Sequence, residues 1–189
     1  MLKNLKNSIV FILATVVILL VFSISLVAAS PARQIEVRGT SVSANTAVKT
    51  EAASAPSAAL NEYENAVAAL INNYRVANGL NAIAYNGTLT YVAKLRSQDL
   101  MDRNYFSHYT PEGTNVFNLF RANGINFKIG GENLAQAMPA SIGTPEAFLN
   151  AWSNSPAHNA NMLRVGYGLI GVGMVSNGDR IVVTTVFTN

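Results

Sequence analysis

Cysteine is absent from this chain of 189 residues, and histidine occurs only twice. Without cysteine there is no disulfide, no thiol nucleophile and no cysteine-ligated zinc, so an exported domain must be stabilised by its core alone. The chain also lacks an H-E-x-x-H motif, a Gly-x-Ser-x-Gly nucleophile elbow and a phosphate-binding glycine loop. The chain therefore has no local motif of the zinc peptidases, serine hydrolases or nucleotide-binding enzymes that these motifs identify.

Charged residues are also scarce, at 12% of the chain, and the net charge is +3. Residues 59–189 contain eight basic and eight acidic side chains, so the positive excess lies entirely in the first 58 residues. A folded part with no net charge lacks the broad basic surface of a nucleic-acid-binding protein. We therefore expect no nucleic-acid partner.

The N-terminus has the pattern of an export segment. Lys3 and Lys6 precede an uncharged apolar run from Ile9 to Val27, and Val27-x-Ala29 resembles a signal cleavage site. The run is also close to the roughly 20 residues that span a bilayer, so an uncleaved membrane anchor is the alternative. Residues 1–29 thus predict a secreted or extracellular protein, tethered by this segment if it is not cleaved, with membrane contact only through it.

Residues 30–58 are small and polar, without aromatic residues. Such a segment cannot bury enough apolar surface to offset the entropy of ordering, so we expect a disordered linker. Residues 59–189 then form the folded domain, and about 130 residues are sufficient for one hydrophobic core.

Helical patterns dominate the first part of this domain. Asn61 and Glu64 have capping-box spacing, and apolar residues then recur at helical intervals up to Gly79. Thr144-Pro145 and Ser155-Pro156 each combine an N-cap residue with a proline in the first turn. Helices are therefore expected at about 62–78, from near Thr88 to Met101, at about 115–122, at about 145–152, and from Pro156 onward, with His158 in the first turn.

The C-terminus changes to strand patterns. "LIGVGMV" and "RIVVTTVF" are β-branched runs separated by Ser176-Asn177-Gly178-Asp179, which predicts a hairpin. A further strand is expected in "INFKIGGENLA", before Glu132. Helices followed by antiparallel strands predict an α+β fold, a three-layer α-β-α sandwich with a central, mainly antiparallel sheet.

Three polar residues lie where the apolar periodicity lapses: His108 in "YFSHYTPEG", Glu132 in "GGENLAQ" and His158 in "AWSNSPAHNANML". Imidazoles bind Zn²⁺ or Cu²⁺ and a carboxylate can complete or orient such a site, and the same set could transfer protons. From the residues alone, the alternative is that each histidine is a hydrogen-bonded loop or cap residue. Glu132 could likewise cap a helix or turn carrying "ENLAQAM".

Other candidates have structural interpretations. Trp152 has helical spacing with its apolar neighbours and is expected in the core, whereas Tyr109 could line a cleft or fill the core. Glu146 fits the first turn of its helix. Asn72 and Arg75 fall on the polar side of the first helix and are expected to be solvated or structural.

The order of these segments is similar to the CAP superfamily of cysteine-rich secretory, antigen 5 and pathogenesis-related proteins. "INNYRVANGLNAIAYNGTLTYVA", "YFSHYTPEG", "GGENLAQ", "AWSNSPAHNANML" and "IGVGM" carry the resemblance, which extends over about residues 61–188. The bacterial, cysteine-free branch of SCP-like extracellular proteins is the most similar. The resemblance implies an α-β-α sandwich with a cleft formed by two histidines and two acidic residues.

Residue by residue, His108 matches the first family histidine, Glu132 the glutamate of "GEN", and His158 the second histidine. The family's other glutamate falls three residues after the tryptophan, where this chain has Ser155. The resemblance therefore implies an incomplete tetrad, with His108 and His158 as metal ligands and Glu132 as a ligand or orienting carboxylate. Ser155, Tyr109 and Asn133 are further candidates for the cleft.

The resemblance implies three functions. The first is an exported binding or interaction module whose cleft takes a metal ion (Zn, Cu or Ca), a lipid or a small ligand. The second is a metal-dependent hydrolase, a protease or nuclease, that uses His108, Glu132 and His158. The third is a structural cell-envelope or spore-surface protein. The missing nucleophile, the neutral domain and the missing second glutamate favour the first, with a small ligand, a lipid or an envelope protein as the partner.

Overall fold

The computed structural model of the chain describes residues 55–189, so the expectations for residues 1–29 and for most of 30–58 lie outside it. Within residues 55–189 the strands β1 (Ala84–Tyr85), β2 (Gly130–Ala137), β3 (Leu169–Ser176) and β4 (Ile181–Thr188) form one sheet in the order β1-β3-β4-β2. The short β1 pairs parallel with β3, and the other pairings are antiparallel.

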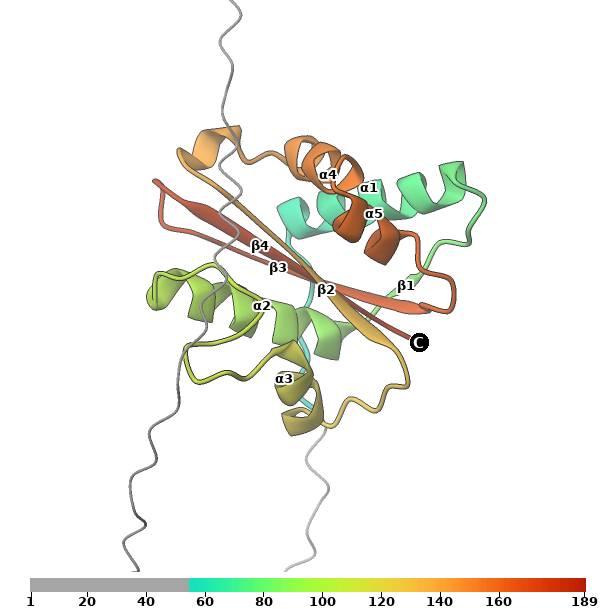
Figure 1. Ribbon diagram of the computed structural model, residues 1–189, viewed down its shortest axis with the longest axis horizontal. Coiled ribbons are helices and arrows are strands. Elements are labelled where there is room, and N and C mark those ends of the chain that lie inside the picture. The colour runs from blue at the N-terminus through green and yellow to red at the C-terminus, as the bar shows by residue number, and fades with distance from the viewer. Residues whose placement is uncertain (1–54) are drawn as a thin grey trace, which may run out of the picture. The chain divides into compact units, whose positions relative to one another are not determined.

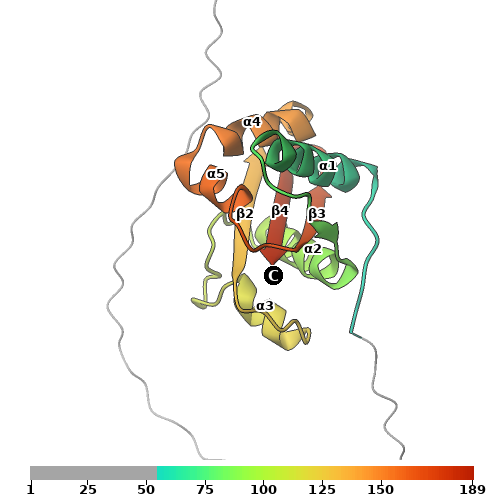
Figure 2. The ribbon, with the colours of Figure 1, turned by 90° about the vertical axis from the view of Figure 1, so that its right-hand side faces the viewer.

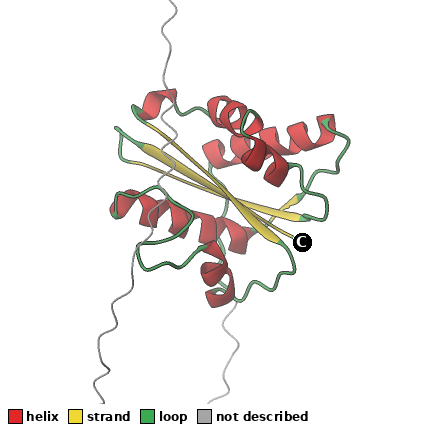
Figure 3. Cartoon of the chain, in the orientation of Figure 1, coloured by secondary structure: helices red, strands yellow, loops and turns green. Residues whose placement is uncertain are grey.

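Helices cover both faces of this sheet (Figures 1 and 2). On one face lie α1 (Glu62–Ala77), α4 (Pro145–Ser153) and α5 (Pro156–Met162), and on the other lie α2 (Gly87–Asp102) and α3 (Val116–Ala122). A short 3₁₀ helix, η1 (Ala140–Ile142), follows β2. Figure 3 shows the strands between the two helical layers, which confirms the α+β three-layer sandwich.

The helix boundaries follow the capping signals. Asn61 accepts a hydrogen bond from the Glu64 amide at 2.8 Å, and the Glu64 carboxylate accepts one from the Asn61 amide at 2.8 Å, so the predicted capping box is confirmed. Thr144 caps α4, which has its proline in the first turn as expected. Helix α2 begins one residue before Thr88, because the side chain of Asn86 accepts from the Leu89 amide at 2.9 Å.

The expectation for Glu132 was wrong in its structural setting. The segment does not form a cap or turn, and the strand does not end before Glu132: β2 runs from Gly130 to Ala137 with Glu132 inside it. Glu132 pairs with Val186 of β4. Small and polar residues have weak strand propensity, and pairing with the apolar β4 determines the conformation here.

Strand β4 forms the centre of the core and is buried along its whole length. Its alternating side chains enter opposite layers: Val183 and Phe187 join the cluster under α1, α4 and α5, and Val186 joins the cluster under α2 and α3. Trp152 is 2% exposed in the first cluster, which confirms its expected place in the core.

Two glycines in β3 allow α2 to approach the sheet closely. A Cβ on Gly171 would lie 2.3 Å from the Leu89 carbonyl carbon, and one on Gly173 would lie 2.2 Å from the Ala93 carbonyl carbon. These contacts are with helix backbone, so a side chain could be accommodated only by moving α2. The "GVG" sequence is therefore a packing feature.

Arg75 is structural, and the alternative that it is solvated was wrong. Its side chain is almost fully buried and donates to the backbone carbonyl oxygens of Asn81 (3.1 Å), Met162 (2.6 Å) and Arg164 (3.2 Å). Helix α1 thereby fixes the C-terminal end of α5. Asn72 is also structural, since its side chain donates to and accepts from the backbone of Ile83.

Candidate functional site

The loop that carries His108 is held by a buried arginine. Arg96, on the inner face of α2, is 1% exposed and donates to the Tyr105 hydroxyl and to the Ser107 carbonyl oxygen. Its Nε lies 3.1 Å from Oε2 of Glu132. One guanidinium therefore connects the loop before α3 to the edge strand β2.

Glu132 links this arginine to His108. Oε1 of Glu132 lies 2.7 Å from Nδ1 of His108, so each carboxylate oxygen has a partner. A carboxylate only accepts hydrogen bonds, so Nδ1 of His108 carries the proton and Nε2 is left as the free nitrogen. The Glu132 side chain is 4% exposed and that of His108 is 51% exposed. Glu132 thus fixes the orientation of the imidazole through Nδ1, while about half of the His108 side chain stays exposed to solvent.

His158 forms the opposite wall. It lies in the first turn of α5, as predicted, and its Nδ1 is 2.9 Å from the Ser155 hydroxyl. Ser155 is the N-cap residue of α5 but makes no side-chain cap hydrogen bond, so its hydroxyl is committed to the imidazole. Burial, and secondarily the nearby charge of His108, lower the pKa of His158. His158 is therefore neutral near pH 7.

A chain of amide groups attaches α5 to β2. Asn133 is 1% exposed and donates to the His158 carbonyl oxygen at 3.1 Å. Asn161 donates to the Asn133 side-chain oxygen at 2.8 Å and accepts from the Tyr167 hydroxyl at 2.7 Å. A Cβ on Gly131 would lie 2.3 Å from both the Asn161 oxygen and the Tyr167 oxygen, so only glycine allows the network to close.

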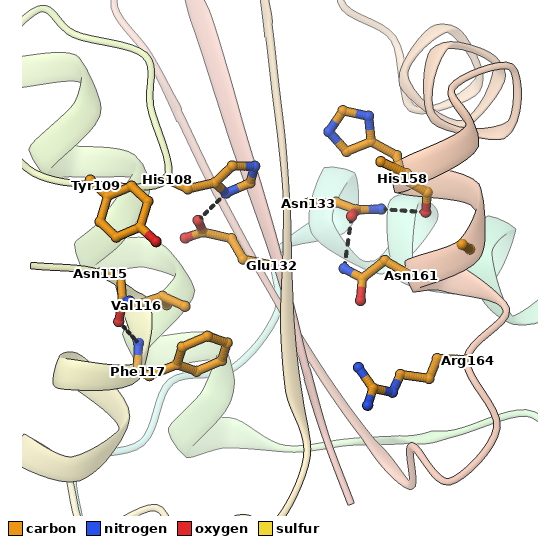
Figure 4. A pocket seen from close by; sticks show the side chains of 12 residues that line it. His108, Tyr109, Asn115, Val116, Phe117, Glu132, Asn133, His158, Asn161 and Arg164 are labelled. Carbon is orange, nitrogen blue, oxygen red and sulfur yellow. Dashed lines mark hydrogen bonds and ion pairs between the residues drawn. The ribbon is translucent and has the colours of Figure 1, made fainter. Parts of the chain in front are cut away.

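The two walls flank an open cavity of about 480 Å³ (Figure 4). In this view the imidazoles of His108 and His158 face each other from opposite sides of β2. The cavity is lined by His108, Tyr109, Asn115, Val116, Phe117, Glu132, Asn133, Ala157, His158, Ala160, Asn161 and Arg164. Its volume falls within the roughly 300–1,000 Å³ of small-molecule sites.

Most of the residues singled out from the sequence meet here. His108, Glu132, His158, Tyr109 and Asn133 line the cavity, and Ser155 supports His158 from behind. Glu146 does not line it and lies in the first turn of α4, as expected.

Sequence reasoning missed Arg96 and much of the cavity wall, including Phe117, Asn161 and Arg164. A signal for Arg96 was present, because it falls within the apolar stripe of α2 between Val92 and Leu100. A cation on a buried helix face requires a partner. Asn161 lies within the segment "AWSNSPAHNANML" that carries the family resemblance, whereas the local sequence contains no comparable signal for Arg164.

The donor groups do not match a tightly held catalytic zinc. Such sites use three protein ligands and an open position, and structural sites use four. Among residues 55–189, no group of three or more His, Asp or Glu side chains is arranged to hold a metal ion. Both oxygens of Glu132 are engaged, so the two imidazole Nε2 atoms are the nitrogens that the site offers as metal ligands.

No helix among residues 55–189 is long and apolar enough to cross a membrane.

The fold, the edge-strand carboxylate and the facing histidines define an α-β-α module with a cavity beside its edge strand. Residues 68–188 match the model of the CAP family, the cysteine-rich secretory protein family, and the chain belongs to it. The uncharacterized protein YkwD of Bacillus subtilis is 37% identical over 105 residues, which is 56% of this chain and 39% of YkwD.

Solved structures show the same fold. An extracellular protein with an SCP domain from Bacillus anthracis is 28% identical, with a TM-score of 0.58 over 67% of this chain and 40% of that chain. An outer surface protein from Borrelia burgdorferi is 21% identical, with a TM-score of 0.61 over 70% of this chain and 96% of that chain. The chain spans about two fifths of YkwD and of the Bacillus anthracis protein, so the match concerns the shared domain and not those whole proteins.

Proposed function

We propose that this CAP domain is an extracellular binding module whose cavity takes one small ligand between His108 and His158. One observation carries the proposal: each imidazole is fixed at Nδ1 by its own partner, and each leaves Nε2 without a partner among residues 55–189. Fixed groups lose little entropy on binding, so they are suited to recognition.

The chemistry of the lining supports a ligand with both polar and apolar parts. Val116 and Phe117 supply an apolar wall, while Asn115 and the imidazoles supply hydrogen-bonding groups. A neutral His158 can donate or accept a hydrogen bond at Nε2, because the pKa of this imidazole is lowered by burial and by the charge of His108.

A metal ion is a second way in which the same two nitrogens could bind. Zn²⁺ and Cu²⁺ accept imidazole ligands, and the contact between Glu132 and Nδ1 of His108 is the usual outer support of such a ligand. With two protein donors, an ion would share its other positions with solvent or ligand. Ca²⁺ fits poorly because it takes six to eight oxygen ligands.

The hydrolase alternative has less support. No Ser, Thr or Lys lines the cavity, so there is no side-chain hydroxyl or amine nucleophile of these types. Glu132 is an unsuitable general base, because its two oxygens are committed to Arg96 and His108. The fold alone does not decide between these functions, since one fold carries many.

An extracellular location is proposed on two grounds. Residues 1–29 have the export pattern described above, with a tether as the alternative to cleavage. The Bacillus anthracis protein of the same fold is described as extracellular.

Calorimetric titration of the purified full chain in mild detergent tests the proposal. Zn²⁺ and Cu²⁺ are the probes, Ca²⁺ is the control ion, and a His108→Ala/His158→Ala double variant is the control protein. Saturable binding of Zn²⁺ or Cu²⁺ that disappears in the double variant would establish the two-imidazole metal form. If neither ion binds, the two imidazoles do not form a metal site. Binding of an organic ligand without metal is then tested with the probes described below. If neither ions nor organic ligands bind, a structural envelope role is favoured.

A further inference from the structure

The cavity has an uncompensated positive charge at one end. Glu132 and Arg164 are the carboxylate and the guanidinium in its lining. The charge of Glu132 is already balanced by Arg96 at 3.1 Å, whereas no carboxylate among residues 55–189 lies within 4.0 Å of Arg164. Arg164 is thus a fixed positive charge in the cavity lining without a carboxylate partner among these residues.

Arg164 is held in a defined position although its side chain is exposed. Its carbonyl oxygen accepts from the buried Arg75 at 3.2 Å, and its guanidinium lies 5.8 Å from the centre of the Tyr167 ring. Figure 4 shows the side chain extending from the segment after α5 toward β2, below Asn161. The guanidinium also interacts with the Tyr167 hydroxyl, and its remaining N–H groups are available for an anion.

An apolar surface lies across the cavity from this cation. Phe117 lines the wall and is stacked on Phe127, with ring centres 5.5 Å apart, and both rings contact Phe120 edge to face. This cluster fixes Phe117 in place. A ligand at Arg164 would thus meet a rigid aromatic ring on the opposite wall of the cavity.

We propose that the cavity recognises a carboxylate joined to an apolar group, with Arg164 as the residue that binds the carboxylate and Phe117 as the apolar contact. The inference rests on the proposed binding function and specifies its ligand class. Arginine pairs with carboxylates through two parallel hydrogen bonds, a geometry that a neutral amide cannot reproduce.

His158 lies in α5 and Arg164 in the segment that follows this helix, and both line the same cavity. A ligand whose carboxylate binds Arg164 can therefore extend along the cavity toward the imidazoles. The C-terminal residues of an extended peptide have this form. A small aryl-alkyl acid of similar length presents the same chemistry.

Matched pairs of probes test the proposal on the full chain in mild detergent. N-acetyl-alanyl-phenylalanine and 4-phenylbutyrate carry the carboxylate, and the corresponding carboxamides lack it. Affinities are measured by calorimetry, and binding in the cavity is verified from shifts of the His108 and His158 imidazole signals. The acid is expected to bind about tenfold or more tightly than its amide, since hydrogen bonds to charged groups are worth about 1.5–3 kcal/mol.

Two variants distinguish a direct contact between Arg164 and the carboxylate from a general attraction by positive charge on the domain. Arg164→Gln should reduce the ratio of acid to amide affinity to about 1, whereas Lys128→Gln removes an exposed cation outside the lining and should leave the ratio unchanged. Preference for the dipeptide over phenylbutyrate would identify a peptide C-terminus as the source of the carboxylate, and the reverse would identify a small acid.

Three results would overturn the inference. Equal affinity for acid and amide, with binding still lost in the His108→Ala/His158→Ala protein, would refute the role of Arg164 and leave the binding function intact. A carboxylate preference that persists in Arg164→Gln would do the same. If no probe binds, the ligand class is wrong, and the metal titration then judges the binding function separately.

Discussion

Replacing Arg96 with methionine is the most informative perturbation of the site. The change keeps an apolar stem of similar length in the core but leaves Glu132 without its cation, on a side chain that is 4% exposed. Removing one partner of a buried ion pair typically costs about 3–5 kcal/mol, because the remaining charge stays desolvated. We expect a loss of this size in the free energy of unfolding, which is a large fraction of the roughly 5–15 kcal/mol of a typical domain.

The same substitution should disturb His108. Arg96 donates to the Tyr105 hydroxyl and the Ser107 carbonyl oxygen, so its loss releases the segment that positions this imidazole. Urea unfolding of the full chain measures the stability, and the imidazole NMR signal of His108 reports its placement. Arg103→Met is the matched control: Arg103 is 37% exposed and pairs with Asp99 and Glu112 at the surface, so its replacement should cost much less than that of Arg96.

A double-mutant cycle determines whether the pair itself causes the loss. In Arg96→Met/Glu132→Leu neither charge remains, so the double variant should be more stable than the sum of the single losses predicts, by about 1–3 kcal/mol. The reasoning fails if Arg96→Met costs less than about 1 kcal/mol or if the two losses simply add.

Three further predictions concern the supporting structure and the pH response. Gly173→Ala should lower the free energy of unfolding by about 1–3 kcal/mol or more, because the added Cβ would lie 2.2 Å from the backbone of α2. In the control Gly168→Ala the added Cβ has its nearest atom at 3.8 Å, so the free energy of unfolding should change by at most about 0.5 kcal/mol. Trp152→Phe removes the 3.0 Å hydrogen bond from Nε1 to the Leu134 carbonyl oxygen and should cost about 1–3 kcal/mol in urea unfolding; no change would refute that role. The lowered pKa of His158 means that the unfolded state binds more protons between the folded pKa and the ordinary value of about 6.5, so stability should fall as the pH drops through this window. The fall should be smaller in His158→Gln, and an identical pH profile of the urea midpoint in both proteins would contradict it.

The parts of the fold that could be predicted were those with strong local signals. The capping box at Asn61 satisfies backbone amides within its own turn. The prolines in the first turns of α4 and α5 have a helical φ already and lack only an N–H that a helix start leaves unpaired. The hairpin between β3 and β4 follows from β-branched runs on either side of Asn177-Gly178.

The parts that could not be predicted depend on distant partners. A strand was expected in this segment before Glu132, but its extent to Ala137 was not. The sequence "GGENLAQA" has no strand periodicity and is extended because it pairs with β4, some fifty positions later. β1 has two residues and pairs parallel with β3, which no local pattern indicates. The burial of Arg75 likewise depends on carbonyl oxygens near the end of α5.

The candidate site shows the same division. The sequence and its family resemblance identified His108, Glu132 and His158, because their motifs are distinctive. Local spacing contains no information that Glu132 contacts Arg96 and His108 at once, since helix α2, a loop and an edge strand meet there. Arg164 lines the cavity because the segment after α5 lies beside β2, a contact between distant parts of the chain.

His108 and His158 face one cavity, and an NMR pH titration of the two imidazoles tests this arrangement most directly. The chain has only these two histidines, so each signal can be assigned by a single substitution. We predict that the pKa of His158 lies below about 6.5 and rises when His108→Gln removes the neighbouring charge, without reaching the ordinary value because burial persists. A His158 that titrates normally, or is unaffected by the loss of His108, would contradict the shared cavity.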